Sequence, residues 1–473
     1  MNVADARARV RESGGVDLLE RLDHLDAHRN EHATENDAPP RPELDAATDF
    51  DVVIVGGGLW SILAPVLAAG GARVAVFDRS RIGVAHREWN ASRPELEALI
   101  AAKLFSADEL DRLIVARYDH GICRFHGGGT YAVHGALDCA VDAGPLLAHA
   151  RELAEQRGVS FFDFHSLDSH SSGRTAVRLK FIDKAGQIRT VTSKLMVDAR
   201  GAASPYATGD LVCPTVGGVL RGLAEGTADT EMNPRVGEIL ATIDPIEKGR
   251  QHVWEAFPGR AGETTVYLFY YARSDENASL AELFARFFAT LPNYKHGTAE
   301  LVRPTFGFIP GWSRLTKAPR PPDPRVVLVG DAAARHSPLT YCGFGATLRS
   351  LGPASRSILE TLDQRKITLK NVMDDPPVHT LTGALAHMLA SRAFEGDSVN
   401  ELLDAAFRTL HEMGDDAYGA LLRDEMRPAA FVEFLRKTAA THPAVWGKIM
   451  RGLGLGVVGR WSLGLARTFA ASA

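Results

Sequence analysis

Residues 51–78 read DVVIVGGGLWSILAPVLAAGGARVAVFD, and this stretch decides the fold. It opens with an apolar run, Val52–Val55, of the kind found in a parallel strand that is buried on both faces. Gly56–Gly58 interrupts the run, Leu59–Ala69 then predicts a helix, and a second apolar run, Val74–Phe77, predicts the next strand. Strand, glycine turn, helix and strand in this order predict a βαβ unit that binds a dinucleotide.

Each part of this unit has a physical role in holding a dinucleotide. Gly56 permits the tight turn, Gly58 lets the backbone approach a pyrophosphate, and the helix N-terminus offers unpaired N–H groups. Asp78 ends the second strand at the spacing of about 20 residues where a carboxylate accepts hydrogen bonds from ribose hydroxyls. Two positions depart from the pattern. Ser61 replaces the third glycine, which we expect to push helix and strand slightly apart, and Pro65 invites a kink.

The bulk composition is that of an ordinary globular protein long enough for two or three domains. Of its 473 residues 45% are hydrophobic and 23% are charged, and the net charge of −5 argues against a nucleic-acid partner. The four cysteines form no CxxC pair, so we expect no metal site, no disulfide framework and a reducing, cytoplasmic setting. We also expect no secretory signal and no membrane-spanning helix. The cysteines are Cys123, Cys139, Cys213 and Cys342.

Two later apolar runs also end in an aspartate. Leu195–Gly201, LMVDARG, is a short strand that ends at Asp198. Val326–Val329 is another, and it ends at Gly330 and Asp331. An aspartate at the end of a strand can accept hydrogen bonds from the hydroxyl groups of a bound ligand.

The loop after Asp331 combines Pro338, Gly343 and Gly345 before a helix that we expect to run to about Leu362. A glycine-rich helix start can stabilise an anion through its unpaired N–H groups. A plain solvated turn would not need these residues together, so the sequence predicts a second ligand-binding segment here.

The stretch after the first βαβ unit gathers four chemically different side chains: Arg87, Glu88, Trp89 and Asn90. Its position predicts a loop that returns towards the ligand. These residues alone favour a surface loop with a buried tryptophan, and Glu88 could simply pair with Arg87 or Arg93.

The rest of the chain alternates between helical and strand patterns. We predict helices over 16–25 and 94–116, a β-hairpin from 177–181 and 188–191, an antiparallel sheet including 253–257 and 266–271, and helices over 402–410 and 431–438. The predicted organisation is α/β: a Rossmann-like cofactor domain with an inserted antiparallel sheet and a helical C-terminal region. Its ranges are an arm and linker (1–48), cofactor domain (49–205), substrate sheet (206–324), cofactor domain again (325–365) and helical region (366–473).

The last 40 residues carry only positive charge. Basic side chains alternate there with Trp446, Trp461 and several leucines, a pattern that suits an anionic membrane surface. A final helix packed on the protein body with a solvated basic face fits the same pattern. The basic residues from Phe434 onward are Arg436, Lys437, Lys448, Arg451, Arg460 and Arg467.

In their order, the three motifs (GGG with Asp78, VDARG at 197–201, and GDA, SP and GFG within 330–345) resemble FAD-dependent flavoproteins. That group includes lycopene cyclases, geranylgeranyl reductases and aromatic hydroxylases. REWNAS at 87–92, TTVYLFYYA at 264–272, LPNY at 291–294 and FGFIPGW at 306–312 look like one subgroup. It comprises the lycopene cyclases of green sulfur bacteria and their cyanobacterial and plant paralogues. The resemblance covers most of the chain from about residue 50.

The resemblance implies an FAD site with assigned parts. Gly56, Gly58 and Asp78 would bind the ADP half, with Ser61 beside them. Arg87 would reach the phosphate or ribityl region, and Asp331, after Gly330, the ribityl chain. Pro338 and Gly343 to Gly345 would face the isoalloxazine ring.

The resemblance further implies cyclisation of a linear carotenoid or other isoprenoid end group without net redox change. A carboxylic acid protonates the terminal double bond, and Glu88 is our candidate for that acid. One alternative is a redox flavoenzyme that reduces or oxygenates an isoprenoid or aromatic substrate with NAD(P)H. Another is a pigment- or lipid-associated protein that uses FAD structurally. A lipophilic substrate would favour peripheral contact with the inner face of the cell membrane.

Overall fold

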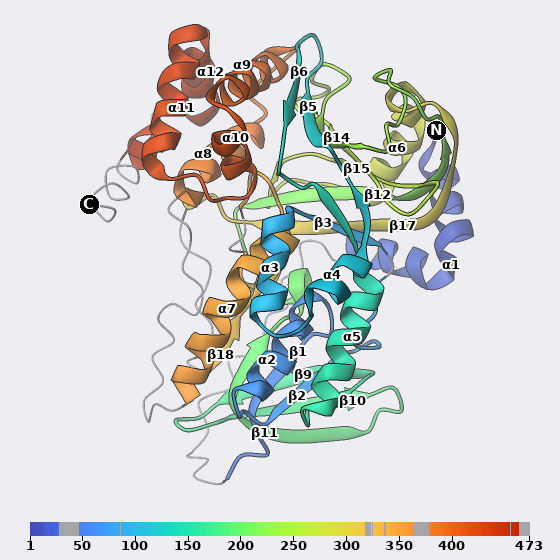
Figure 1. Ribbon diagram of the computed structural model, residues 1–473, viewed down its shortest axis with the longest axis vertical. Coiled ribbons are helices and arrows are strands. Elements are labelled where there is room, and N and C mark those ends of the chain that lie inside the picture. The colour runs from blue at the N-terminus through green and yellow to red at the C-terminus, as the bar shows by residue number, and fades with distance from the viewer. Residues whose placement is uncertain are drawn as a thin grey trace.

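The computed structural model describes residues 1–27, 47–85, 87–316, 323, 325–334, 337–362, 378–454 and 456–462 (Figure 1). Two large sheets dominate the part of the chain that it describes. A seven-stranded sheet, the first sheet, lies in the lower half of Figure 1, and an eight-stranded sheet, the second sheet, lies in the upper half. The fold is α/β, as the sequence predicts.

The first sheet has the strand order β8-β2-β1-β11-β10-β9, and β18 also pairs with β11. Strands β8, β2, β1, β11 and β18 run parallel, and the chain order reverses between β1 and β11. At such a reversal the loops after neighbouring strands diverge and leave a crevice for a ligand. The strands are β1 (Phe50–Val55), β2 (Val74–Phe77), β8 (Ser160–Phe162), β9 (His165–Ser172), β10 (Val177–Asp183), β11 (Ile188–Asp198) and β18 (Val326–Leu328).

Both faces of the first sheet are covered, which explains its continuous apolar strands. Val52 and Ile54 pack against helices on one face, whereas Val53 and Val55 pack with the β9–β10–β11 strands on the other. The helical layer is built from η1 (Leu59–Ile62), α2 (Leu63–Ala69), α3 (Arg93–Ala101), α4 (Ala107–Leu113), α5 (Ala143–Gln156) and α7 (Gly343–Leu362). The turns η2 (Gly201–Ala203) and η3 (Gly330–Ala333) follow β11 and β18.

The second sheet has the order β16-β12-β15-β14-β13-β5-β6, with β17 also paired to β12. Its first two strands in the sequence, β5 and β6, come from the range predicted to belong to the cofactor domain, so the chain enters this sheet twice. The strands are β5 (His120–Arg124), β6 (Thr130–Val133), β12 (Leu211–Leu223), β13 (Val236–Ala241), β14 (Val253–Pro258), β15 (Glu263–Phe269), β16 (Ala272–Arg273) and β17 (Gly297–Gly311).

The outer face of the second sheet is covered by α6 (Leu280–Tyr294). Trp254 of β14 stacks on Tyr294 with ring centroids 4.6 Å apart and lies 5.4 Å from the Phe287 ring. The opposite, inner face contacts a different cluster of apolar residues, which includes Val253, Phe269 and Tyr271.

A small third sheet links the two large ones, and a group of helices ends the chain. The third sheet contains β3 (Glu88–Ala91), β4 (Ile114–Arg117) and β7 (Cys139–Asp142). The helices pack on β5 and β6, with Phe125 and Phe407 rings 5.0 Å apart. They are α8 (His379–Leu389), α9 (Ser398–Met413), α10 (Asp415–Leu422), α11 (Pro428–Thr441) and α12 (Ala444–Leu453).

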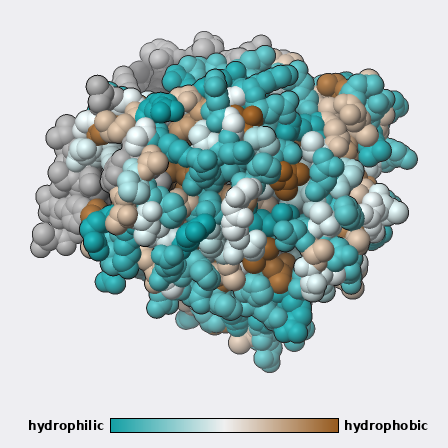
Figure 2. All heavy atoms as spheres, turned by 90° about the horizontal axis from the view of Figure 1, so that it is seen from above, coloured by the Kyte–Doolittle hydropathy of each residue, from teal (hydrophilic) through white to brown (hydrophobic). Residues whose placement is uncertain are grey.

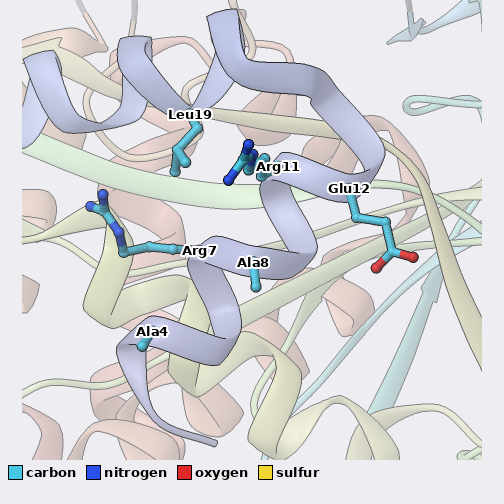
Figure 3. Close-up of a pocket in the computed structure, with 6 residues that line it drawn as sticks. All are labelled: Ala4, Arg7, Ala8, Arg11, Glu12 and Leu19. Carbon is cyan, nitrogen blue, oxygen red and sulfur yellow. The ribbon is translucent and has the colours of Figure 1, made fainter.

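The N-terminal helix α1 (Val3–Ala27) docks on the second sheet, against α6 and β17. It breaks at Gly15, where φ is 77°, and an ion pair between Arg7 and Asp23 joins its two halves. A surface hollow along this helix contains none of the predicted cofactor motifs (Figure 3). It is lined by Ala4, Arg7, Ala8, Arg11, Glu12 and Leu19.

The structure agrees with most of the predicted elements and corrects three. The single predicted helix over 94–116 is wrong: α3 ends at Ala101, α4 begins at Ala107, and Ile114–Arg117 pairs with β7 as a strand. The separate strands 188–191 and 195–197 are one continuous strand, β11, whose two halves pair with different neighbours. Pro65 falls in the first turn of α2, where its missing N–H would have no partner within the helix, so it begins α2 rather than interrupting it.

Candidate functional site

The glycine turn after β1 lies against the loop after β11. Gly56 has a φ of 125°, and a Cβ atom there would lie 2.2 Å from the Ala199 carbonyl oxygen. Glycine is therefore required twice, by the backbone conformation and by the close approach. The first and second motifs of the sequence thus meet at the strand-order reversal.

Asp78 closes the same turn from the end of β2. Its Oδ2 accepts a hydrogen bond from the Gly57 N–H at 2.7 Å, and its Oδ1 accepts from the Ser80 N–H at 2.7 Å and hydroxyl at 2.5 Å. A carboxylate has roughly four acceptor sites, so one remains for a ligand hydroxyl. The predicted contact with ribose therefore stays a prediction, alongside a structural role.

Open space follows the turn. Gly58 is exposed, and no described heavy atom lies within 4 Å of a Cβ built there, whereas Gly57 is packed against Ile82. Ser61 is buried in η1 and its N–H donates to the Gly58 carbonyl at 2.9 Å. The helical segment thus starts as a tight 3₁₀ turn whose N-terminus faces the open side of Gly58.

The third motif completes this cradle. A Cβ on Gly330, whose φ is 58°, would lie 2.7 Å from Nε1 of Trp60 in η1. One on Gly201 would lie 3.9 Å from Oδ2 of Asp331. The three motifs therefore converge pairwise, although long stretches of chain separate them. Trp60 Nε1 is buried and has no hydrogen-bond partner among the described residues, so a polar donor is left over where the motifs meet.

Asp198, in the second motif, has its carboxylate saturated by the protein. It is fully buried and accepts from the Arg200 backbone N–H at 3.1 Å, from Arg200 Nη2 at 2.7 Å and from the Ser204 hydroxyl at 2.7 Å. Its role is to hold the loop after β11 in shape.

The residues predicted to face the flavin ring, in the loop before α7, have different surroundings in the structure. Pro338 lies near Gly311, where an added Cβ would be 3.3 Å from the Pro338 Cβ, so the loop meets the second sheet. Gly343 has open space where a side chain would be, but a Cβ on Gly345 would lie 2.4 Å from Glu95 Oε1. Gly345 therefore allows α7 to pack on α3, and Gly343 remains the better candidate to face a cofactor.

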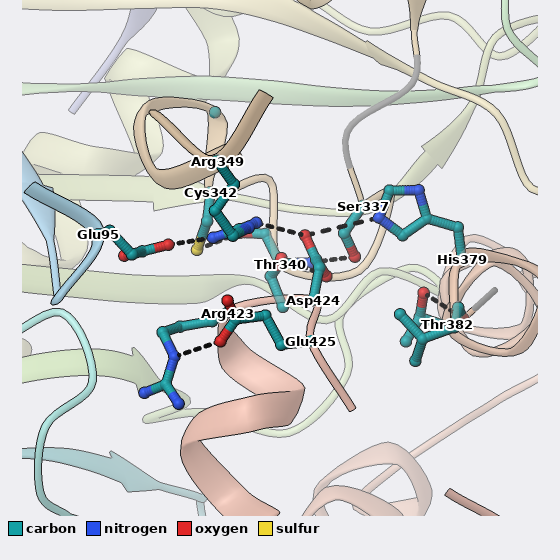
Figure 4. A network of polar contacts seen from close by, with 12 residues as sticks. Glu95, Ser337, Thr340, Cys342, Arg349, His379, Thr382, Arg423, Asp424 and Glu425 are labelled. Atoms are coloured by element: carbon teal, nitrogen blue, oxygen red, sulfur yellow. Dashed lines mark hydrogen bonds and ion pairs between the residues drawn. The ribbon is translucent and has the colours of Figure 1, made fainter. Parts of the chain in front are cut away.

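A buried polar network fixes this loop to the C-terminal helices (Figure 4). Arg349 forms an ion pair with Glu95, and its Nη2 lies 3.7 Å from Asp424 Oδ2. Burial raises the pKa of the Glu95 carboxyl, and the Arg349 charge opposes that rise. Asp424 also accepts from the Thr340 hydroxyl at 3.4 Å.

The 87–92 stretch reaches the inner face of the second sheet. Arg87 Nη1 donates to the Tyr267 hydroxyl at 3.2 Å. Glu88 is buried, accepts from the Thr265 hydroxyl at 3.3 Å and lies 3.9 Å from Arg260 Nε. The alternative in which Glu88 pairs with Arg87 or Arg93 is wrong in its partner, because the cation beside Glu88 is Arg260 of the β14–β15 turn.

Glu255, on β14, is not among the site residues that the sequence predicts. Burial raises the pKa of this carboxyl to about 8. Glu255 pairs across the sheet with Tyr267, and no residue of the described chain hydrogen-bonds or forms an ion pair with it. The signal was present as one acidic residue inside an apolar run, Val253–Phe257, but the pattern cannot say which face it occupies.

Among the described residues, no group of three or more His, Cys, Asp or Glu side chains could hold a metal ion, and the four cysteines are free thiols. No described helix combines the length and apolarity that crossing a membrane requires.

No protein-family model matches the sequence, and no curated protein matches it. The fold does match solved structures. A geranylgeranyl bacteriochlorophyll reductase-like protein from Thermoplasma acidophilum superposes with a TM-score of 0.55 at 16% identity, over 85% of this chain and 99% of its own. The halogenase PltM superposes with a TM-score of 0.60 at 12% identity, over 89% of this chain and 98% of its own. A flavoprotein/dehydrogenase from Cytophaga hutchinsonii superposes with a TM-score of 0.56 at 13% identity, over 86% of this chain and 98% of its own.

These matches define the class of fold. Over most of its length the chain has the Rossmann-type architecture of FAD-binding flavoproteins, among them PltM, whose structure is known in complex with phloroglucinol and FAD. At such low identity the likeness extends to the fold and not to a reaction.

Proposed function

We propose that this protein is an FAD-dependent enzyme that cyclises an end group of a carotenoid or other isoprenoid. The observation that supports FAD binding is the pairwise convergence of the three motifs at the strand-order reversal. Flavoproteins of this fold bind their nucleotide at that place. Open space at Gly58 and the unpartnered Trp60 Nε1 fit a ligand at this place.

The chain's own residues divide the task of holding FAD. The backbone N–H groups after Gly58 would take the pyrophosphate, and the free acceptor site of Asp78 would take a ribose hydroxyl. Asp331 would hold the ribityl chain, while Pro338 and Gly343 would border the ring. In its reduced form the bound flavin supplies a negatively charged ring that stabilises a neighbouring cation.

The inner face of the second sheet suits a hydrocarbon substrate. It meets the cofactor loop, since the Tyr271 hydroxyl donates to the Leu339 carbonyl and the Tyr271 and Tyr341 rings lie 6.1 Å apart. A Cβ on Gly307 would have no described atom within 4 Å, so this face is not fully packed. Aromatic rings beside open space can border an apolar chain and stabilise positive charge on it.

A redox reaction with NAD(P)H is the second candidate. It is favoured by the structural neighbours, which are a reductase-like protein, a flavoprotein/dehydrogenase and a halogenase. Residues 454–459, GLGVVG, match G-x-G-x-x-G at all three glycines, but they follow the helix α12 and not a strand, so they offer no second nucleotide site of this type.

Product analysis tests the proposal. We expect the full chain, expressed in a bacterial host that accumulates lycopene, to purify with non-covalent FAD and to produce carotenoid of unchanged mass with ring end groups. A product heavier by two hydrogens or by oxygen would replace cyclisation by the redox reaction. Protein that never takes up FAD would overturn both.

We also propose salt-sensitive membrane contact through the C-terminal region. Arg436, Arg451 and Arg460 are exposed, whereas Lys437 and Lys448 are paired with Glu433 and Glu401. Trp461 is buried in the core beneath the helices, which removes one of the two tryptophans of the predicted membrane segment, and Arg467 lies outside the described residues. Figure 2 shows only scattered apolar patches on the face it presents, so contact there would be mainly electrostatic.

Liposome flotation measures this contact. Replacing the three exposed arginines with glutamine should weaken binding to anionic vesicles by about 1 kcal/mol per charge. The matched control replaces Lys437 and Lys448, whose charges are already paired, and should have a smaller effect. Equal effects of the two sets would remove this surface from the proposal.

A further inference from the structure

Glu255 lies on the inner face of the second sheet, as the positions of its neighbours show. On β14, Trp254 packs against α6, so the alternating residues Val253, Glu255 and Phe257 point to the inner face. Tyr267, directly opposite on β15, shares that face. The inner face is the one that meets the loop of Pro338 and Tyr341.

Glu255 differs from three other buried carboxylates around the second sheet, which are paired. Glu263 binds Arg221 and Arg303, Glu238 binds Lys295 and the Tyr294 hydroxyl, and Glu88 binds Arg260 and Thr265. Glu255 is half-buried and has no hydrogen bond or ion pair with any described residue. A partly buried carboxyl without a protein partner is costly, and such groups are candidates for a functional role.

The surroundings of Glu255 keep its proton in place near neutral pH. Burial raises its pKa to about 8, and no cation is among the causes of that shift. Burial also raises the pKa of the Cys213 thiol and of the Tyr271 phenol, and in both cases the Glu255 charge adds to the rise. Tyr267, opposite Glu255 on β15, accepts a hydrogen bond from Arg87 Nη1 at 3.2 Å.

From this geometry we infer that Glu255, rather than Glu88, is the catalytic acid of the inner face. The inference rests on the proposed cyclisation and names the residue that starts it. Glu88 lies at the edge of the same face, but Thr265 and Arg260 occupy its oxygens. An acid that must give its proton to a carbon–carbon double bond needs its O–H free of such partners.

The step balances without an external oxidant or reductant. The Glu255 O–H bond breaks, and the π electrons of the terminal double bond form a new C–H bond with that proton. The cation left on the neighbouring carbon is attacked by the next double bond, which closes the ring through a new C–C bond. Loss of a proton from a carbon beside the second cation restores a double bond, and the Glu255 carboxylate takes it up.

The experiment compares three full-length variants in the lycopene-accumulating host. Glu255→Gln should retain FAD and lose ring formation by at least about a hundredfold in kcat with little change in KM. Glu255→Asp, which keeps the acid on a shorter side chain, should restore part of the activity. Glu88→Gln, the variant of the rival acid, should retain much more ring formation than Glu255→Gln, since its proton is not the one transferred.

The outcomes separate the two proposals. If the unmodified protein cyclises its substrate and Glu255→Gln does so at a near-normal rate, the role of Glu255 is overturned and the proposed function stands. Loss of cyclisation in Glu88→Gln alone would return the role to Glu88. If the unmodified protein contains FAD but forms only reduced or oxygenated product, the proposed function fails, and the assignment of Glu255 as its acid fails with it.

Discussion

The proposed roles of the two large sheets depend on different parts of the chain. In the first sheet the role depends on the backbone: Gly56 approaches Ala199 closely, and Gly58 leaves open space where a ligand is expected to lie against the turn. In the second sheet the proposed role depends on one side chain, Glu255. Its neighbours Tyr267 and Trp254 establish that it lies on the inner face. Backbone requirements recur as sequence motifs, whereas an isolated side chain in a strand does not.

The largest effect should come from the two glycines of the first sheet, which the structure separates. Gly56→Ala places a Cβ 2.2 Å from a carbonyl oxygen at a φ of 125°, so we expect a loss of about 4 kcal/mol or more in the free energy of unfolding, even without flavin. Gly58→Ala should leave the apoprotein nearly as stable and weaken FAD binding by about tenfold or more. Denaturant unfolding and flavin titration measure the two quantities.

The opposite pattern, with Gly58→Ala unfolding the apoprotein and Gly56→Ala leaving it stable, would mean that the turn is not held against β11. Equal FAD affinity of Gly58→Ala and the unmodified protein would remove the pyrophosphate from that open space.

In the second sheet the expected effect is smaller and depends on pH. The Glu255 carboxyl titrates near its ordinary pKa of 4.5 in the unfolded chain and near 8 in the folded protein. Between these values the unfolded chain releases a proton that the folded protein keeps, so stability falls as pH rises through this window. Glu255→Gln should remove that loss and raise stability by a few kcal/mol at pH 8, with a smaller gain at pH 5.

Thermal unfolding of both proteins at pH 5 and pH 8 measures the difference. The control is Glu263→Gln, because two arginines stabilise the Glu263 carboxylate and hold its pKa below the ordinary value despite the opposing effect of burial. That variant should lose stability at both pH values. A Glu255→Gln protein whose stability gain is independent of pH would show that the carboxyl is solvated and unsuited to donate a proton near neutral pH.

The smallest expected loss of stability comes from the contact between the N-terminal helix α1 and α6 on the outer face of the second sheet. Asp26 caps α6 from another element, accepting from the Leu280 N–H and the Ser279 hydroxyl, each at 2.7 Å. Asp26→Ala should cost about 1–2 kcal/mol, as loss of a helix cap does. Asp17→Ala on the exposed side of the same helix is the control and should change stability by less than about 0.5 kcal/mol. Equal losses would mean that α1 does not hold α6.

The pattern of the sequence accounted for much of the first sheet because its information is local. A run such as Val52–Val55 is apolar since both faces are covered, and a glycine turn with Asp78 at a set spacing records a backbone geometry within one βαβ unit. The alternating runs of β14 and β15 likewise predicted an antiparallel sheet, because side chains alternate between its faces.

What the sequence by itself determined is therefore the α/β class, the glycine turn, the acids at the strand ends and the order of the motifs. Only the tertiary structure decided that Gly345 packs on Glu95, that Glu88 pairs with Arg260, and that Glu255 has no partner among the described residues. The physical reason is that pairing, burial and the pKa of a carboxyl depend on groups far away in the chain, which only folding brings within a few ångströms.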